Sequence, residues 1–290
     1  MSCSTAFLAR QGRTDDDLAP MNAELEITIL GCGSSGGVPR ADGNWGACDP
    51  HDRRNLRTRC SLLVRRSAGQ PDAEATSLVV DTSPDFRLQA VAAGLRRVDG
   101  VLYTHDHADQ THGIDDLRAF ALAKAGRTDC WMDEATRAHL TERFGYVFEG
   151  ILDYPAICTP LPLPPHGTRW SVDGPSGAIP VITFPQAHGP IESVGYRFGD
   201  VAYSSDVSEL PEAAAPALEG LQLWILDALR WRPHPTHANV AKALEWIERF
   251  RPQRAVLTNL HVDLDYVELA RQLPSGVEPA YDGWRTRIPI

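Results

Sequence analysis

The chain has 290 residues, of which 43% are hydrophobic and 23% are charged, and its formal net charge is −10. This composition is sufficient for a sizeable hydrophobic core. The acidic balance disfavours an extended nucleic-acid surface, which would need clustered Lys and Arg, and no stretch approaches the roughly 20 consecutive apolar residues that cross a bilayer.

The N-terminal segment and the cysteines bear on where the protein works. Residues 1–23 contain an Asp run and lack the apolar core of a secretory signal. We therefore expect a disordered tail over 1–23 and a single domain over 24–290. Six cysteines are scattered without a CxxC pair, which favours reduced thiols over a disulfide framework. These features together predict a cytoplasmic protein.

The first half of the chain is predicted to hold strands that lead into short helices. Leu25, Ile27 and Ile29 alternate with polar residues and indicate a strand over 24–30. A Gly-rich run over 31–37 follows, and such runs occur where the backbone needs unusual angles or a ligand comes close. Further strands are expected at 61–65, 76–81 and 100–104, and helices at 86–93 and 114–125. The segment 131–144 is expected to start with a strand residue or two and to become helical.

The second half repeats this mixture. Strands are expected at 181–184, 193–198, 201–205, 221–226 and 254–258, and helices at 209–218, 237–250 and 266–273. Val240, Leu244 and Ile247 share one side of the helix expected at 237–250, as an amphipathic helix requires. Two such halves fit two sheets packed face to face with helices outside. We therefore predict an α/β fold, a four-layer αββα sandwich.

A run of metal-ligand residues follows the apolar strand at 100–104. His105 and His107 are two residues apart, so a tight loop can turn both imidazoles toward one ion, and Asp109 comes two residues later. Imidazole and carboxylate suit zinc, and also manganese or iron. Three alternating ligand residues directly after a strand are uncommon by chance, so the sequence predicts a metal-binding loop.

Three more candidate ligands follow predicted strands. These are His188, Asp206 and His261. Each has an ordinary alternative explanation: His188 as a loop histidine, for example, and Asp206 as a helix cap with Glu209 three residues on. Their shared position at the carboxyl ends of strands is where an α/β scaffold usually builds its site.

These residues together resemble the metallo-β-lactamase superfamily. Its signature is His-x-His-x-Asp-His after a strand, followed by a distant His, a distant Asp and a final His, and the six residues above stand in that order. Within the superfamily the chain is similar to phosphodiesterases of the carbon–phosphorus lyase pathway, which act on a cyclic ribosyl phosphate. The similar features are the loop 31–38, Ser204-Ser205-Asp206, His237 opening a helix, and Leu273-Pro274-Ser275-Gly276.

The resemblance implies a role for each matching residue. His105, His107 and His188 would hold a first metal, Asp206 would bridge, and Asp109 and His261 would hold a second. Asp109 and His237 would act in catalysis, with His237 as general acid toward the leaving oxygen. The cofactor would be zinc or manganese, with one or two ions per chain.

Two departures from the signature concern the second metal. Gln110 stands where the signature has its last His, and a neutral amide is a poor zinc ligand beside imidazole. Asn259 stands where relatives often have the final His, so His261 is an inferred substitute. His112 lies two residues beyond Gln110, and a small adjustment would bring it in. These changes predict that the second metal is bound weakly, is absent or has different ligands.

The implied function is a phosphodiesterase that attacks a small cyclic or nucleotide-like phosphate with a metal-activated hydroxide. Arg57 and Arg59 belong to an arginine cluster and are candidates for binding substrate phosphate, together with His237. A thioester or lactone hydrolase on the same fold remains an alternative, as does a weakly active or non-catalytic member that binds metal or nucleotide. Extended nucleic acid and membranes are not expected as partners, and a homodimer is compatible with this reading.

Overall fold

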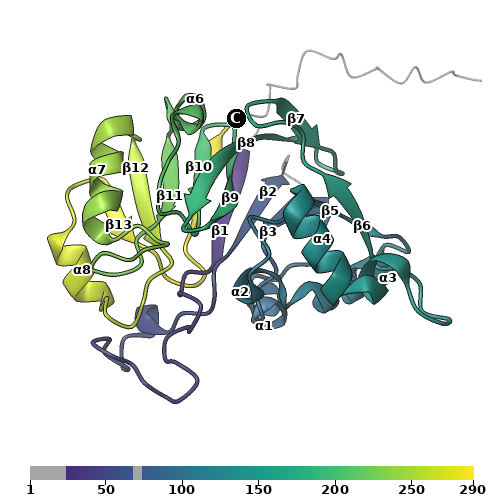
Figure 1. Cartoon of the computed structure of the whole chain (residues 1–290), viewed down its shortest axis with the longest axis horizontal. Coiled ribbons are helices and arrows are strands. Elements are labelled where there is room, and N and C mark those ends of the chain that lie inside the picture. The colour runs from purple at the N-terminus through teal and green to yellow at the C-terminus, as the bar shows by residue number, and fades with distance from the viewer. Residues whose placement is uncertain (1–23, 68–73) are drawn as a thin grey trace, which may run out of the picture.

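The computed structural model describes residues 24–67 and 74–290, so the tail expected over 1–23 lies outside the described residues. Fourteen strands form two seven-stranded sheets in the described part (Figure 1). The first sheet has the order β14-β1-β2-β3-β4-β5-β6. Its strands are β1 (Glu24–Gly31), β2 (Ser61–Ser67), β3 (Thr76–Val80), β4 (Gly100–Leu102), β5 (Thr128–Met132), β6 (Cys158–Pro162) and β14 (Arg285–Pro289).

The second sheet has the order β13-β12-β11-β10-β9-β8-β7. Its strands are β7 (Arg169–Val172), β8 (Ile179–His188), β9 (Ile191–Phe198), β10 (Val201–Ser204), β11 (Leu223–Asp227), β12 (Arg254–Thr258) and β13 (Val277–Pro279). In both sheets the antiparallel pairs lie on one side and the parallel pairs, β3 to β6 and β10 to β13, on the other.

Helices cover the outer face of each sheet (Figure 1). Those beside the first sheet are α1 (Phe86–Ala92), α2 (Ala108–Thr111), η4 (Ile114–Leu117), α3 (Arg118–Ala123), α4 (Glu134–Arg143) and α5 (Gly145–Glu149). Those beside the second sheet are η5 (Glu212–Ala214), α6 (Ala215–Leu218), α7 (Val240–Phe250) and α8 (Tyr266–Gln272). A short 3₁₀ turn, η2 (Arg53–Asn55), lies in the long segment between β1 and β2.

Three buried apolar layers hold this arrangement together. The central layer joins residues of both sheets, such as Ile27 and Ile225. One outer layer packs the first sheet against its helices, and the other packs the second sheet against α6, α7 and α8 around Trp224. Helix, sheet, sheet and helix therefore follow one another, as the four-layer sandwich predicted.

Several elements differ in extent from their sequence-based prediction. The helix expected at 209–218 is a 3₁₀ turn and a four-residue helix, because Pro211 and Pro216 interrupt the segment. The helix expected at 237–250 begins only after Asn239, whose side chain accepts a hydrogen bond from the Lys242 backbone N–H, 3.1 Å away. His237 consequently lies in the loop before α7 rather than in the helix.

Three strands end in residues with left-handed backbone angles. Asp81 follows β3 with φ 61°, Asp206 lies two residues after β10 with φ 53°, and Asn259 follows β12 with φ 62°. Such angles cost a non-glycine residue on the order of 1–3 kcal/mol and gather at functional sites. All three side chains are buried, so the strand ends turn polar groups inward.

The central layer gives a stability prediction. Ile225 in β11 is 0% exposed, whereas Leu122 in α3 is 64% exposed. We expect Ile225→Ala to lower the free energy of unfolding by about 2–5 kcal/mol, because it leaves a cavity between the sheets. Leu122→Ala should change it by less than about 0.5 kcal/mol. Urea unfolding of both variants measures the difference, and equal effects would contradict the assignment of the core.

Candidate metal centre

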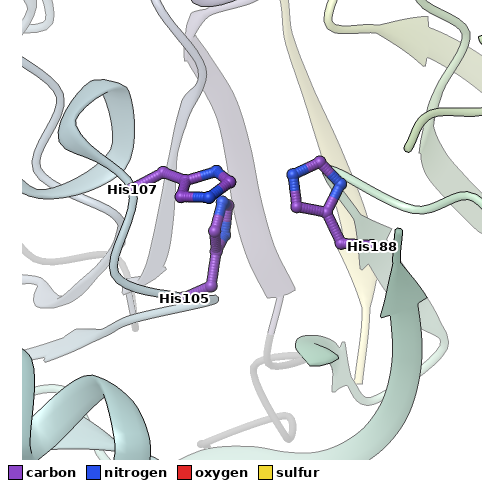
Figure 2. A group of neighbouring side chains, drawn as sticks. All are labelled: His105, His107 and His188. Carbon is purple, nitrogen blue, oxygen red and sulfur yellow. The ribbon is translucent and has the colours of Figure 1, made fainter. Parts of the chain in front are cut away.

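Three histidines from two sheets meet at one edge of the sandwich. His105 and His107 lie on the loop after β4, and His188 ends β8. Figure 2 shows their rings pointing toward one another from opposite sides. Their ring centroids are 4.5 to 5.1 Å apart, and one nitrogen of each lies within 4.8 Å of the others. These three residues form a group with the spacing of metal ligands.

The ring of His105 is held by two residues behind it. Thr104 donates its hydroxyl proton to Asp81, 2.8 Å away, and therefore accepts from Nδ1 of His105 at 2.9 Å. Nδ1 thus carries the ring proton and Nε2 holds the lone pair. His105 is 1% exposed, and its Nε2 has no hydrogen-bond partner. Burial lowers the pKa of His105 to about 3, so the ring is neutral.

His188 is oriented in the same way. Its Nδ1 lies 2.6 Å from the carbonyl oxygen of Thr236, to which it must donate. Burial lowers its pKa, and Nε2 is left as the free lone pair. Metal-binding histidines are commonly held by such a hydrogen bond on the other ring nitrogen. Two neutral imidazoles whose Nε2 lone pairs point toward one another are suited to bind a divalent cation. No hydrogen-bond donor of the three histidines is placed to occupy these lone pairs.

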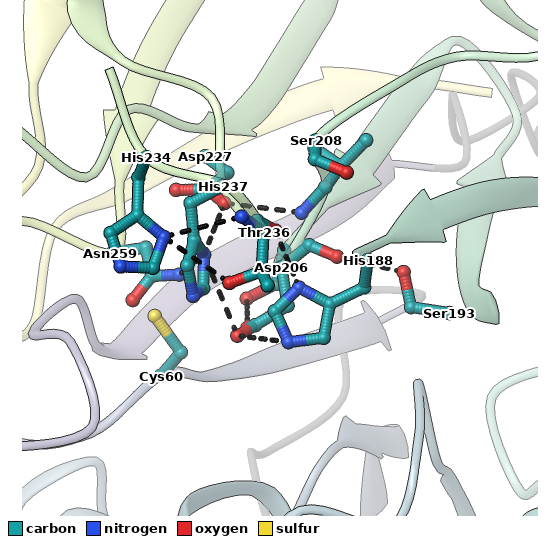
Figure 3. A network of polar contacts seen from close by, with 12 residues as sticks. Cys60, His188, Ser193, Asp206, Ser208, Asp227, His234, Thr236, His237 and Asn259 are labelled. Atoms are coloured by element: carbon teal, nitrogen blue, oxygen red, sulfur yellow. Dashed lines mark hydrogen bonds and ion pairs between the residues drawn. The ribbon is translucent and has the colours of Figure 1, made fainter. Parts of the chain in front are cut away.

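Asp206 lies beside these histidines and is 2% exposed. Its carboxylate accepts a hydrogen bond from the Ser205 hydroxyl at 2.7 Å. One oxygen is 3.9 Å from Nε2 of His188 and 3.8 Å from Nδ1 of His237, and Figure 3 shows it between the two rings. Burial alone would raise the pKa of Asp206, but the nearby imidazoles, His237 foremost, lower it to about 2. The side chain is an ionised carboxylate available to a cation.

Gln110 stands where the superfamily signature has its last histidine, and it contacts Asp206. It is 0% exposed, and its amide nitrogen lies 3.0 Å from Asp206 and 3.4 Å from Asp109. The amide is oriented with its NH₂ toward the two carboxylates. Burial, followed by the charge of Asp206, raises the pKa of Asp109 to about 6.

His237 and Asp227 form a charged pair beside the three histidines. Its Nδ1 donates to Asp227 at 2.8 Å (Figure 3). Asp227 is 0% exposed and also accepts from the backbone N–H of Val207 at 3.1 Å. Burial opposes protonation of His237, but the charge of Asp227 outweighs it and raises the pKa of His237 to about 9. The nitrogen of His237 that faces Asp206 is therefore already bonded to Asp227.

The remaining second-metal candidates lie elsewhere. Nε2 of His261 contacts the Arg40 guanidinium, and its Nδ1 is 3.3 Å from Asp263. Among the described residues, two groups have the spacing of metal ligands: His105, His107 and His188, and His188, Asp206 and His237. His261 belongs to neither group. The exposed ring of His112 packs against Phe144, with centroids 5.4 Å apart. The amide of Asn259 lies 3.2 Å from Nδ1 of His237.

The sequence profile described as "Beta-lactamase superfamily domain" matches residues 76–259, more than half of the chain. The chain belongs to the metallo-β-lactamase superfamily. Superfamily membership makes it a metallo-β-lactamase-fold hydrolase, and this fold implies the use of a divalent metal.

Similar proteins include a solved diphosphatase from the PhnP family, 32% identical, which covers 91% of this chain and 97% of its own with a TM-score of 0.80. Zn²⁺-bound PqqB from Methylobacterium extorquens is 18% identical with a TM-score of 0.67 over 90% of this chain and 99% of its own, and shares the fold. An octanoyltransferase of Porphyromonas gingivalis is 32% identical over 89% of this chain. The chain spans about half the length, 51%, of that protein.

The two arginines predicted to bind phosphate, Arg57 and Arg59, contact other groups of the protein. Arg57 is buried, and it donates to the Asn55 side chain at 3.0 Å and to the His261 carbonyl at 3.3 Å. Arg59 forms an ion pair with Asp85 at 3.1 Å. Neither side chain lines the cavity beside the histidines. Both arginines fix the segment between β1 and β2.

A cavity of about 450 Å³ adjoins the metal centre through His237. We call it the basic pocket, because its ionisable lining is Arg40, Arg230, His234, His237 and His261, and the rest is Ser34, Ser35, Gly36 and Leu229. No motif in the sequence marks Arg40, Arg230 or His234 as members of a site. The residues that contact the histidines from behind were also not predicted: Asp81, Thr104, Asp227 and Thr236. Asp81 and Asp227 stand at the ends of apolar runs, and this position is the signal that the sequence offers for them.

The support behind His105 gives a prediction. Thr104→Val keeps the shape of the side chain but removes the hydroxyl that fixes Nδ1 of His105. We expect zinc affinity to fall about 10–100-fold, as with other groups that orient metal ligands. Thr128→Val is the matched control, because the Thr128 hydroxyl is buried without a hydrogen-bond partner. Competition with a fluorescent zinc chelator measures both, and equal affinities in the two variants would contradict the role of Thr104.

Proposed function

We propose that the chain is a metal-dependent phosphodiesterase acting on a small phosphorylated substrate. One observation carries the proposal: the lone pairs of His105 and His188 converge beside Asp206, next to a protonated His237 held by Asp227. A cation site and a proton donor are the two parts that phosphoester hydrolysis needs.

The proposed ligands of the ion are His105, His107, His188 and Asp206. Nitrogen donors with one carboxylate suit zinc, and manganese is also compatible. A divalent cation held there supplies Lewis acidity, which polarises a phosphoryl oxygen and acidifies a water molecule. Asp109 lies next to this group through Gln110 and Asp206, and we propose that it orients the attacking water.

His237 is the proposed general acid. Because its Nδ1 proton is bonded to Asp227, the transferable proton is the one on Nε2. Asp227 keeps the ring protonated and fixes its angle. The Nε2 proton would go to the leaving oxygen as the phosphorus–oxygen bond breaks, which avoids release of an alkoxide.

Phosphate is favoured over a thioester or lactone by the charge of the basic pocket. Arginine and imidazole groups line it, whereas an acyl chain would need an apolar wall. The similarity to a protein named as a diphosphatase, over 97% of that chain, supports the same class. The octanoyl transfer named for the Porphyromonas gingivalis protein is not carried over, because only about half of that protein aligns.

The substrate class is tested with purified protein of measured metal content. We expect hydrolysis of bis-p-nitrophenyl phosphate that depends on zinc or manganese and is lost after chelation. A panel of acyl thioesters and lactones should give no comparable rate. Faster thioester or lactone hydrolysis would replace the proposal by the acyl alternative, and inactivity of the fully loaded protein toward both would favour a non-catalytic member.

The role of His237 predicts a dependence on the leaving group. His237→Ala should slow hydrolysis of adenosine 2′,3′-cyclic phosphate about 10²–10⁴-fold, the usual contribution of a general acid. Hydrolysis of bis-p-nitrophenyl phosphate should fall much less, because p-nitrophenolate leaves without a proton. Asp227→Asn should show the same pattern more weakly. Equal losses on both substrates would mean that His237 acts through the fold or the metal instead.

We also propose one tightly bound ion per chain. Gln110 already joins Asp109 and Asp206, and His237 takes the remaining side of Asp206 as a cation. Gln110→His should raise the zinc content toward two ions per chain, because it restores an imidazole between the two carboxylates. His112→Gln, outside the site, is the control. Elemental analysis after gel filtration decides, and two ions in the unchanged protein would contradict the proposal.

A further inference from the structure

His107 is held differently from the other two histidines of the metal centre. The rings of His105 and His188 are each oriented by a hydrogen bond on Nδ1, to Thr104 and to a backbone carbonyl. The side chain of His107 is exposed, and within residues 24–67 and 74–290 no hydrogen bond reaches either nitrogen of its ring. The direction of this ring therefore depends on the backbone on either side of it.

The peptide that follows His107 is fixed by the short helix α2. The carbonyl oxygen of His107 accepts a hydrogen bond from the Thr111 hydroxyl at 2.9 Å and another from the backbone N–H of Gln110 at 3.1 Å. His107 itself is the N-cap residue of α2. These bonds constrain the peptide after His107, so the peptide before it has to be constrained by another part of the chain.

The preceding peptide is held by two side chains of α4. The carbonyl oxygen of Asp106 belongs to the same planar peptide unit as the backbone nitrogen of His107, and it accepts a hydrogen bond from Nη1 of Arg143 at 2.6 Å. Nη2 of the same guanidinium donates to the Asp106 carboxylate at 2.8 Å, and Nδ1 of His139 lies 2.9 Å from that carboxylate oxygen. Arg143 thus binds the backbone and the side chain of one residue, for which its planar group of donors is suited.

This contact differs from the other arginine pair of α4. Arg137 pairs with Glu134 three residues before it, and both side chains are exposed, so this pair contributes little to the free energy of unfolding. The Asp106 side chain is 16% exposed and stands between two proposed metal ligands in the sequence. The Arg143 side chain is itself 42% exposed. We therefore expect Arg143 to affect the geometry of the loop more than the stability of the fold.

We propose that Arg143 is a positioning residue of the metal centre. It fixes the peptide between Asp106 and His107, so that the ring of His107 is directed at the ion without a hydrogen bond of its own. His139 assists by holding the same carboxylate. A bond to the outer ring nitrogen commonly does this for a metal-binding histidine, and here a bond to the backbone takes its place. The inference rests on the proposed ligand set, in which His107 is a ligand.

A double-mutant cycle of zinc affinity tests the proposal. The variants are Arg143→Met, which keeps the aliphatic stem, His107→Ala, and the two combined. Arg143→Lys is the conservative variant, and Arg137→Met is the matched control on the same helix. Zinc affinity is measured by competition with a fluorescent chelator, and the Tm of each metal-free protein is measured by circular dichroism.

We expect Arg143→Met to lower zinc affinity about 10–100-fold, the usual loss when a group that orients a metal ligand is removed. Arg143→Lys should lose less, because one ammonium replaces only part of the two-donor contact, and Arg137→Met should bind zinc as the unchanged chain does. The double variant should bind no more weakly than His107→Ala alone, since the arginine acts through that ring. The Tm of the metal-free arginine variants should agree within about 2 °C, because exposed ion pairs contribute little to stability.

Cobalt provides a readout that a change in stability would not move. With Co²⁺ in place of zinc, the visible absorption spectrum depends on the type and geometry of the ligands. We expect the spectrum of Arg143→Met to shift toward that of His107→Ala, and Arg137→Met to keep the original spectrum.

Failure of this inference is distinguishable from failure of the proposed ligand set. Equal zinc affinities of Arg143→Met and Arg137→Met, with a large loss in His107→Ala, would overturn the role of Arg143 and leave the ligand set. A full additional loss in the double variant would also overturn it, because the arginine would then act independently of His107. Unchanged zinc affinity in His107→Ala would instead overturn the ligand set on which the inference rests.

Discussion

The buried charge of Asp206 is the constraint on which the rest of the site depends. An ionised carboxylate removed from water is tolerated only where hydrogen bonds and opposite charges replace its hydration. Asp206 receives them from Ser205 beside it, from Gln110 after the metal loop, and from the charged ring of His237. These groups come from both sheets and from the loop before α7. The charge is therefore accommodated only when the two halves of the sandwich have met, which couples the site to the fold.

The groups around Asp206 divide into two kinds. His105 and His188 are neutral, and each has its Nδ1 proton directed away, to Thr104 and to a backbone carbonyl. Their inward lone pairs repel Asp206 until a cation lies between them. His237 is the opposite case, because Asp227 keeps it charged. A cation should therefore stabilise the folded chain on the His105 side, whereas the His237 side is already balanced without one.

The sequence allowed most of the strands to be predicted, together with the loop that carries His105 and His107, whereas the surroundings of His261, Arg57 and Arg59 could not be predicted. Apolar patterns located β1 to β4 and β8 to β12 but missed β5, β6, β7, β13 and β14, and the spacing of His105 and His107 indicated the loop after β4. The prediction for His261 followed motif order, which does not register that Arg40 and Asp263 face its ring. Arg57 and Arg59 read as exposed cations, yet one is buried against Asn55 and the other is paired with Asp85. Such contacts join residues distant in sequence, and no local pattern records them.

Asp227 connects the two sides of the site. It ends β11, and a single oxygen accepts both from the backbone N–H of Val207, directly after Asp206, and from Nδ1 of His237. Ala238 next to His237 also donates to the carbonyl of Val207 at 2.6 Å. The loop that carries His234 and His237 is thus fastened to the strand end that carries Asp206. The position of His237 relative to the metal-ligand residues is therefore set by the backbone at β10 and β11, so the proposed proton donor needs little rearrangement to act beside them.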